Sequence, residues 1–202
     1  MASWIELLSG AEPGEHVVQL YGEDDQLLTR NVSRYLAEGL RRGDGLVVIA
    51  TPEHTRGIVG HLVEGNSGAA LDAVGDGRLV LLDAAETLER LLLDGHLHEA
   101  LFGSVVGEVV AAVRARAATG CARAFGEMVS LLWEAGRHHD AARLEDLWNH
   151  LLPDSGCSLY CAYRIDLFDH PGDAAALQPI VASHDHVLAG AGTLLSSDRR
   201  RA

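Results

Sequence analysis

The sequence contains no lysine, because all 16 basic residues of this 202-residue chain are arginines. Schiff-base catalysis needs a lysine amine, and a phosphate-binding P-loop needs a lysine beside its Ser or Thr. Both kinds of site are therefore excluded. The chain is also strongly acidic, with 29 acidic residues and a formal net charge of −13. An acidic surface repels phosphate backbones, so we expect no nucleic-acid binding.

Cysteines and long apolar runs are also scarce. The three cysteines are Cys121, Cys157 and Cys161, which is an odd and small number. The N-terminus does not have the pattern of a secretory signal. We therefore expect reduced thiols in a cytoplasmic protein. Cys157 and Cys161 share one face of an expected strand, where buried packing and a metal or redox pair remain alternatives. No run of 18 apolar residues occurs, so the sequence predicts no membrane span.

Short apolar runs alternate with helical periodicity along most of the chain. The runs predict strands at 16–21, 46–50, 78–83, 122–128 and 158–163, with 129–134 continuing past a turn. Helices are expected at 23–41, 51–63, 84–93, 101–118, 137–151 and 179–188, with a Gly-rich loop after residue 63. This alternation predicts a three-layer α/β fold, with a mainly parallel sheet flanked by helices.

In an open parallel sheet, binding sites form beyond the carboxyl ends of the strands. Four expected strand ends, together with a nearby aromatic residue, give the candidate ligand-binding set: Tyr21, Glu23, Thr51, Asp83, Glu127, Met128 and Trp133. We assign no catalytic residue and no metal ligand, and the cofactor stays unknown. For Glu127 the alternatives are pocket lining, a buried structural hydrogen bond and catalysis.

The acidic run 23–25 follows the first expected strand and begins the next helix. A P-loop, which joins a strand to a helix, would hold phosphate at this position. Like charges repel, so this run disfavours a bound triphosphate. The acids either complement the dipole of the following helix or bind a cation or an amine. His16 and Tyr21 are five residues apart and should face opposite sides of their strand, with His16 a hydrogen-bonded edge residue.

Two histidine pairs, His138–His139 and His184 with His186, invite a metal interpretation. On a helix, neighbouring residues and residues two apart point in different directions. Neither pair therefore forms a ready pair of ligands, and no metal site is assigned.

Several short motifs together resemble the MEDS family, the methanogen/methylotroph sensory domain. They are His16 with Tyr21, and the stretches 36–39, 45–51, 126–128, 131–133, 144–149 and 184–188. The resemblance covers residues 14–190 and leaves 1–13 as an N-terminal extension and 191–202 as a flexible tail. It implies a fold similar to RecA/KaiC-type ATPase domains, without a P-loop.

The resemblance also implies a function in sensing and signal transduction. Such a domain would bind a small molecule or signal and act through a protein partner, such as a histidine kinase or a transcription regulator, without ATPase activity. One alternative is a ligand-free protein-interaction module. Another is a metal-assisted hydrolase that uses Glu127 with histidines. Assembly into a homo-oligomer rests on fold analogy alone.

Overall fold

A single mixed sheet forms the centre of the computed structural model, which describes residues 4–165, 174–189 and 193–196. The strand order is β3-β2-β6-β7-β1-β8-β9, and every neighbouring pair is parallel except β8 with β9. These strands are β1 (His16–Leu20), β2 (Gly45–Ala50), β3 (Leu79–Asp83), β6 (Ala122–Gly126), β7 (Cys157–Tyr163), β8 (His186–Ala189) and β9 (Thr193–Ser196). The mainly parallel α/β sheet expected from the sequence is confirmed.

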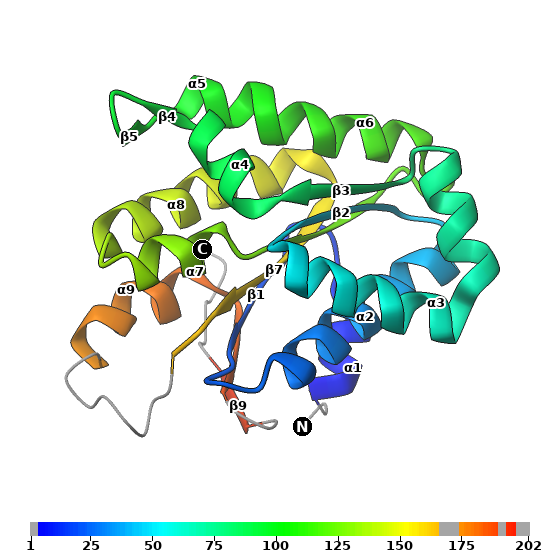
Figure 1. Cartoon of the computed structure of the whole chain (residues 1–202), viewed down its shortest axis with the longest axis horizontal. Coiled ribbons are helices and arrows are strands. Elements are labelled where there is room, and N and C mark those ends of the chain that lie inside the picture. Colours follow the sequence, from blue (N-terminus) through cyan, green and yellow to red (C-terminus); the bar gives the residue numbers. More distant parts are fainter. Residues whose placement is uncertain (1–3, 166–173, 190–192, 197–202) are drawn as a thin grey trace.

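Helices cover both faces of this sheet and complete three layers (Figure 1). One face carries α1 (Trp4–Gly10), α2 (Asp25–Arg42) and α3 (Pro52–Gly75). The other carries α4 (Ala84–Arg90), α5 (Glu99–Phe102), the π-helical turn η1 (Gly103–Gly107), α6 (Glu108–Arg116), α7 (Met128–Glu134), α8 (His138–Ser155) and α9 (Ala174–Ser183). A small antiparallel hairpin, β4 (Leu92–Leu93) with β5 (His96–Leu97), follows α4.

Local sequence signals fix the helices that lead away from the carboxyl edge of the sheet. Asp24 caps α2 by accepting a hydrogen bond from the Leu27 N–H at 2.8 Å. Gly43 ends the same helix in the left-handed conformation, at φ +85°. Thr51 caps α3, and Pro52 fills its first turn, where a missing N–H costs nothing. The loops after β1 and β2 are therefore short and well defined.

Four elements differ from the sequence predictions. The Gly-rich stretch after residue 63 is helical, because α3 continues to Gly75 and packs against α2. Residues 129–134 form α7 instead of an extended segment. The closing helix ends at Ser183, and 186–189 instead pair with β1 as β8. Within the expected tail, 193–196 form β9.

The histidine at the start of β1 also lies elsewhere than expected. His16 is buried, because β1 is an inner strand between β7 and β8. Its side chain faces α8, whereas Tyr21 belongs to the opposite core with α2, so the expected opposite orientation is confirmed.

A buried arginine connects the sheet to the N-terminal segment. Arg123 in β6 is 2 % exposed, and its Nε donates to Asp44 Oδ2 at 3.2 Å. The remaining guanidinium N–H groups donate to the backbone carbonyls of Leu8, Ser9, Ala11 and Tyr35. A buried cation needs such partners, so α1 supplies part of the solvation of a core residue.

Among the described residues, no helix combines the length and the apolar character needed to cross a membrane.

Candidate functional site

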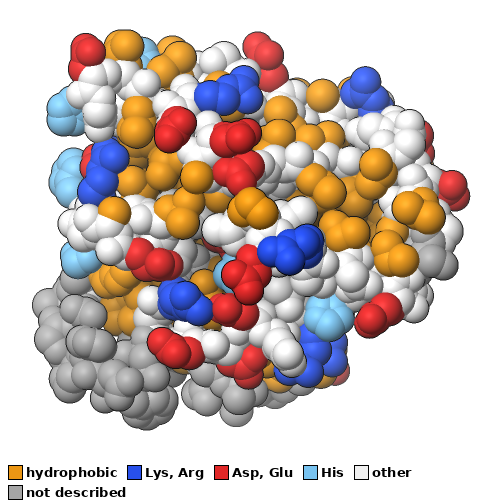
Figure 2. All heavy atoms as spheres, viewed as in Figure 1, with side chains coloured by type: hydrophobic (Ala, Val, Ile, Leu, Met, Phe, Trp, Pro, Cys, Tyr) orange, Lys and Arg blue, Asp and Glu red, His pale blue; other side chains and the backbone are white. Residues whose placement is uncertain are grey.

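A polar pocket of about 360 Å³ opens at the carboxyl edge of the sheet. It lies where the loops after β1, β2, β6 and β7 meet, and Figure 2 shows acidic, basic and histidine side chains gathered there. Its lining consists of Tyr21, Asp25, Thr51, Pro52, Glu53, His54, Arg56, Glu127, Ser130, Leu131, Glu134 and Arg164. The strand-end rule for open parallel sheets places sites at this edge.

Glu127 is the central buried group of the pocket. It directly follows β6, is 2 % exposed, and turns its carboxylate across to the start of α3. The Thr51 backbone N–H donates to its Oε1, and His54 Nδ1 lies 2.6 Å from its Oε2. A carboxylate at a helix N-terminus is also stabilised by the helix dipole. Glu127 therefore joins the β2–α3 loop to the β6–α7 loop.

His54 carries this network on to α2 and to the end of β7. Its Nε2 lies 3.3 Å from Asp25 Oδ1, and Arg164 Nη2 donates to both carboxylate oxygens of Asp25, at 3.1 and 3.2 Å. The Arg164 backbone N–H donates to Ser130 Oγ at 3.0 Å, and that hydroxyl donates to Glu134. One continuous polar chain thus links the loops after four strands.

Charges in the pocket shift the protonation of two side chains. The hydrogen bond to Glu127 raises the pKa of His54 above its ordinary value, although partial burial opposes the shift. Burial, together with the Glu127 carboxylate, raises the pKa of the Tyr21 phenol, which therefore stays protonated. The lining holds four carboxylates against two guanidinium groups and His54, so the site favours positive or hydrogen-bond-donating ligands.

The structure brings together three of the residues selected from the sequence. Tyr21, Thr51 and Glu127 all line the pocket. Glu23 lies exposed in the loop before α2. The other three, Asp83, Met128 and Trp133, lie away from the lining: Asp83 Oδ1 caps α4 through the Glu86 N–H, and Met128 and Trp133 pack in the core, where Trp133 stacks on His138.

Several lining residues were not selected from the sequence. His54 is the third residue of α3, so the Thr51-Pro52 helix start already placed it near the strand end. Arg164 directly follows β7, and applying the strand-end rule to that strand would have found it. Asp25 belongs to the acidic run 23–25, for which binding of a cation or an amine was one of two alternatives. Ser130 carried no distinguishing signal, because polar residues are common in the first turns of helices.

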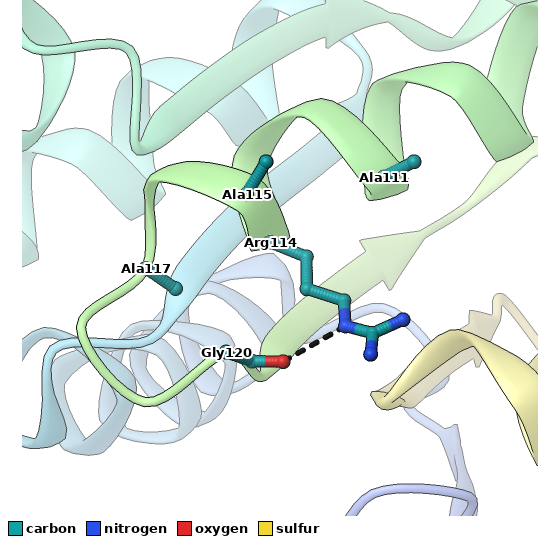
Figure 3. A pocket seen from close by; sticks show the side chains of 5 residues that line it. All are labelled: Ala111, Arg114, Ala115, Ala117 and Gly120. Atoms are coloured by element: carbon teal, nitrogen blue, oxygen red, sulfur yellow. Dashed lines mark hydrogen bonds between the residues drawn. The ribbon is translucent and has the colours of Figure 1, made fainter.

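A second hollow, of about 460 Å³, lies at the opposite end of the sheet, beside the loop from α6 to β6 (Figure 3). Alanines form most of its lining, and its one charged side chain, Arg114, donates from Nε to the Gly120 carbonyl at 2.9 Å. This hollow offers little chemistry for recognising a polar ligand. The pocket at the carboxyl edge is therefore the stronger candidate.

Comparison with known proteins agrees with the motifs noted in the sequence. No curated protein matches the chain significantly. The family model of the MEDS domain, the methanogen/methylotroph, DcmR sensory domain, matches residues 15–185, which include every residue that lines the carboxyl-edge pocket. The chain thus belongs to the MEDS family of sensory domains.

Proposed function

We propose that this protein is a signal-transduction domain that binds a small polar molecule in the carboxyl-edge pocket and acts through a protein partner. The family match supports a sensory role. The observation that carries the ligand proposal is the buried Glu127 carboxylate, which connects two loops beneath an open polar pocket. Open parallel sheets bind ligands beyond the carboxyl ends of their strands, which is where Glu127 lies.

The chemistry of the lining favours a small amine or another cation as the ligand. Asp25, Glu53, Glu127 and Glu134 outnumber the cationic groups, and only Pro52 and Leu131 supply aliphatic surface. A protonated amine would find carboxylate acceptors from α2, α3 and α7. An anionic ligand would meet net repulsion there.

Ligand binding would alter the polar chain that holds the loops together. A cation that competes for Asp25 would release Arg164, and one that competes for Glu127 would release His54 at the start of α3. Either change would shift surface loops that a histidine kinase or a transcription regulator could recognise. A ligand acts as a signal only through such a difference between two states.

We also propose that the domain lacks ATPase activity and is related to RecA/KaiC-type folds. Support comes from β1, an inner strand whose following loop leads into α2 where a P-loop would lie. Asp24 caps α2 there, and Asp25 accepts from Arg164, so carboxylates occupy the position where phosphate would bind. The three free cysteines support a reducing, cytoplasmic location.

Native mass spectrometry of freshly purified full-length protein tests the ligand proposal first. A copurified molecule would be released by denaturation and identified. In parallel, primary to quaternary alkylamines would be titrated by NMR, with neutral alcohols and carboxylates of equal size as controls. We expect amines to shift the resonances of His54 and Ser130, and the controls to leave them unchanged.

Variants then locate the binding site. Asp25→Asn removes a lining carboxylate and should weaken amine binding, whereas Glu23→Gln, an exposed carboxylate two residues away, should not. Amine binding that is equal in both variants would contradict the proposed pocket. Bare protein that binds none of these probes would favour the ligand-free interaction module, which a pull-down of signalling proteins would then examine.

A further inference from the structure

Four metal-ligating side chains meet in the interior, on the face of the sheet that α8 covers. They are His16 at the start of β1, Glu145 in α8, Cys161 in β7 and His184 just before β8. All four are buried, and one potential ligand atom from each lies within 4.8 Å of the others. None of them lines the carboxyl-edge pocket, so this buried cluster is a separate feature.

Three separations among His16, Glu145 and Cys161 match the edges of a coordination tetrahedron, and His184 completes the set within 4.8 Å. Zinc bonds of about 2.0–2.3 Å at tetrahedral angles place neighbouring ligand atoms roughly 3.3–3.7 Å apart. His16 Nε2 lies 3.3 Å from both Glu145 Oε2 and Cys161 Sγ, and Cys161 Sγ lies 3.7 Å from that oxygen. His184 Nε2 lies 3.4 Å from the other oxygen of that carboxylate, Glu145 Oε1.

Outer hydrogen bonds fix which ring nitrogen of each histidine faces the cluster. His184 Nδ1 lies 2.6 Å from the Ile180 carbonyl, which can only accept, so Nδ1 carries the proton. His16 Nδ1 lies 3.0 Å from Asn149 Oδ1, and Asn149 Nδ2 in turn donates to the Ser183 carbonyl. In a neutral imidazole the Nε2 lone pair then points inward, which is the usual arrangement of metal-bound histidine.

The carboxylate of the cluster is held in the same way. Tyr163 OH donates to Glu145 Oε1 at 2.8 Å, which leaves Oε2 directed toward His16 and Cys161. Metal-ligating carboxylates generally have such a second hydrogen-bonding partner. The cluster therefore shows both the inner ligand set and the outer support that a metal site requires.

We propose that His16, Glu145, Cys161 and His184 bind one Zn²⁺ ion. Two neutral imidazoles, a thiolate and a carboxylate suit a borderline cation, whereas Mg²⁺ and Ca²⁺ require oxygen ligands. The charges of the thiolate and the carboxylate would neutralise the ion, so the occupied site would carry no net charge inside the core. Binding releases the thiol proton to solvent.

This site differs from the histidine pairs that the sequence brings to attention. His184 and His186 do not act together, because His186 belongs to β8 and its Nε2 lies 3.8 Å from Glu15 Oε1 near the surface. The two residues do not share the helix that the sequence predicts over 179–188, because α9 ends at Ser183. The fold instead pairs His184 with ligands from three other elements.

Four protein ligands correspond to a structural zinc site, not to a catalytic one with an open position. The ion would join β1 and β7 to α8 and to the segment that leads into β8. Removing it should loosen that side of the domain without disturbing the pocket at the carboxyl edge. Failure of the zinc proposal would therefore leave the ligand proposal intact, and the reverse also holds.

Metal analysis of the full-length protein, purified without chelators or affinity metals, provides the test. We expect about one equivalent of zinc per chain, as for a single structural site. The metal would be removed by chelation under mild denaturation to give the metal-free protein. Adding Zn²⁺ back should raise the midpoint of thermal unfolding of that protein by roughly 5–10 °C once the free metal concentration reaches about 100 times its Kd. Reloading with Co²⁺ should give tetrahedral d–d bands and a thiolate-to-cobalt charge-transfer band.

Two cysteines of the same strand provide a matched pair of variants. Cys161→Ser should lose the charge-transfer band and most of the bound metal, whereas Cys157→Ser, equally buried but outside the cluster, should keep both. If Cys161→Ser does not fold, His184→Gln is compared with His186→Gln by metal content. The inference is overturned if the folded wild-type protein takes up neither metal, or if Cys157→Ser and Cys161→Ser lose metal equally.

Discussion

Replacing Glu127 with glutamine should lower the pKa of His54 and destabilise the domain in a pH-dependent way. The carboxylate accepts from the Thr51 N–H and lies 2.6 Å from His54 Nδ1. Glutamine keeps the shape and an oxygen for Thr51 but removes the charge that favours the imidazolium. Since Glu127 is the largest cause of the raised pKa of His54, and burial acts in the opposite direction, the pKa in the variant should fall.

The magnitude follows from the kind of hydrogen bond that is lost. A hydrogen bond to a charged partner contributes about 1.5–3 kcal/mol. Glu127→Gln should therefore reduce the free energy of unfolding by about that amount near pH 6. For a chain of this size the midpoint of thermal unfolding should fall by roughly 3–12 °C.

The sign of the pH dependence follows from the raised pKa of His54. A histidine whose pKa is higher in the folded state stabilises the fold fully below its unfolded pKa of about 6.5. That stabilisation is lost as the pH rises through the folded-state pKa. The difference in stability between wild type and Glu127→Gln should therefore be largest at acidic pH and shrink above that range.

NMR titration of the histidine side chains measures the pKa, with His54 identified among the 11 histidines from the spectrum of His54→Gln. Glu53→Gln is the control, because Glu53 is an exposed neighbour of His54 in the same pocket. An unchanged His54 pKa in Glu127→Gln would refute the assigned coupling. So would an equal drop in pKa in both variants.

Further predictions concern the fold around the site. Arg123→Met should remove the closest ion-pair partner of the buried Asp44 carboxylate and cost about 3–5 kcal/mol in urea unfolding. Arg143→Met, at an exposed 3.6 Å ion pair, should cost less than about 1 kcal/mol. Equal losses would contradict the assigned burial. Gly45→Ala should destabilise by about 1–3 kcal/mol, because its Cβ would lie 2.5 Å from a backbone oxygen of α6. Gly60→Ala meets open space in α3 and should stabilise by about 0.5–1 kcal/mol, which the same unfolding curves would reveal.

The sequence predicted five of the seven strands, because β1, β2, β3, β6 and β7 are short apolar runs that periodicity detects directly, but it missed β8 and β9. It also predicted that Tyr21, Thr51 and Glu127 meet, since the carboxyl ends of parallel strands share one edge. Periodicity failed where tertiary contact outweighed local preference. Glycine disfavours helix, yet packing against α2 carries α3 to Gly75.

The residues that the sequence argument missed are those brought together from distant parts of the chain. His16 and Cys161 are 145 positions apart, and no local pattern relates them. The sequence predicts a helix over 179–188, which contains His184 and His186. That prediction gives no reason to place His184 beside Glu145. Spacing rules for metal ligands apply within one element, whereas these four residues come from β1, α8, β7 and the segment before β8.

The hydrogen bonds of Arg123 determine where the N-terminus of a recombinant fragment can begin without loss of stability. Three of its four carbonyl acceptors belong to Leu8, Ser9 and Ala11, all of which precede residue 15, where the family match begins. A recombinant fragment trimmed to the matched segment would remove those acceptors and leave a guanidinium in the core with too few partners. Truncation at that boundary would thus produce a less stable protein. Binding measurements on this fragment would underestimate the affinity of the intact chain.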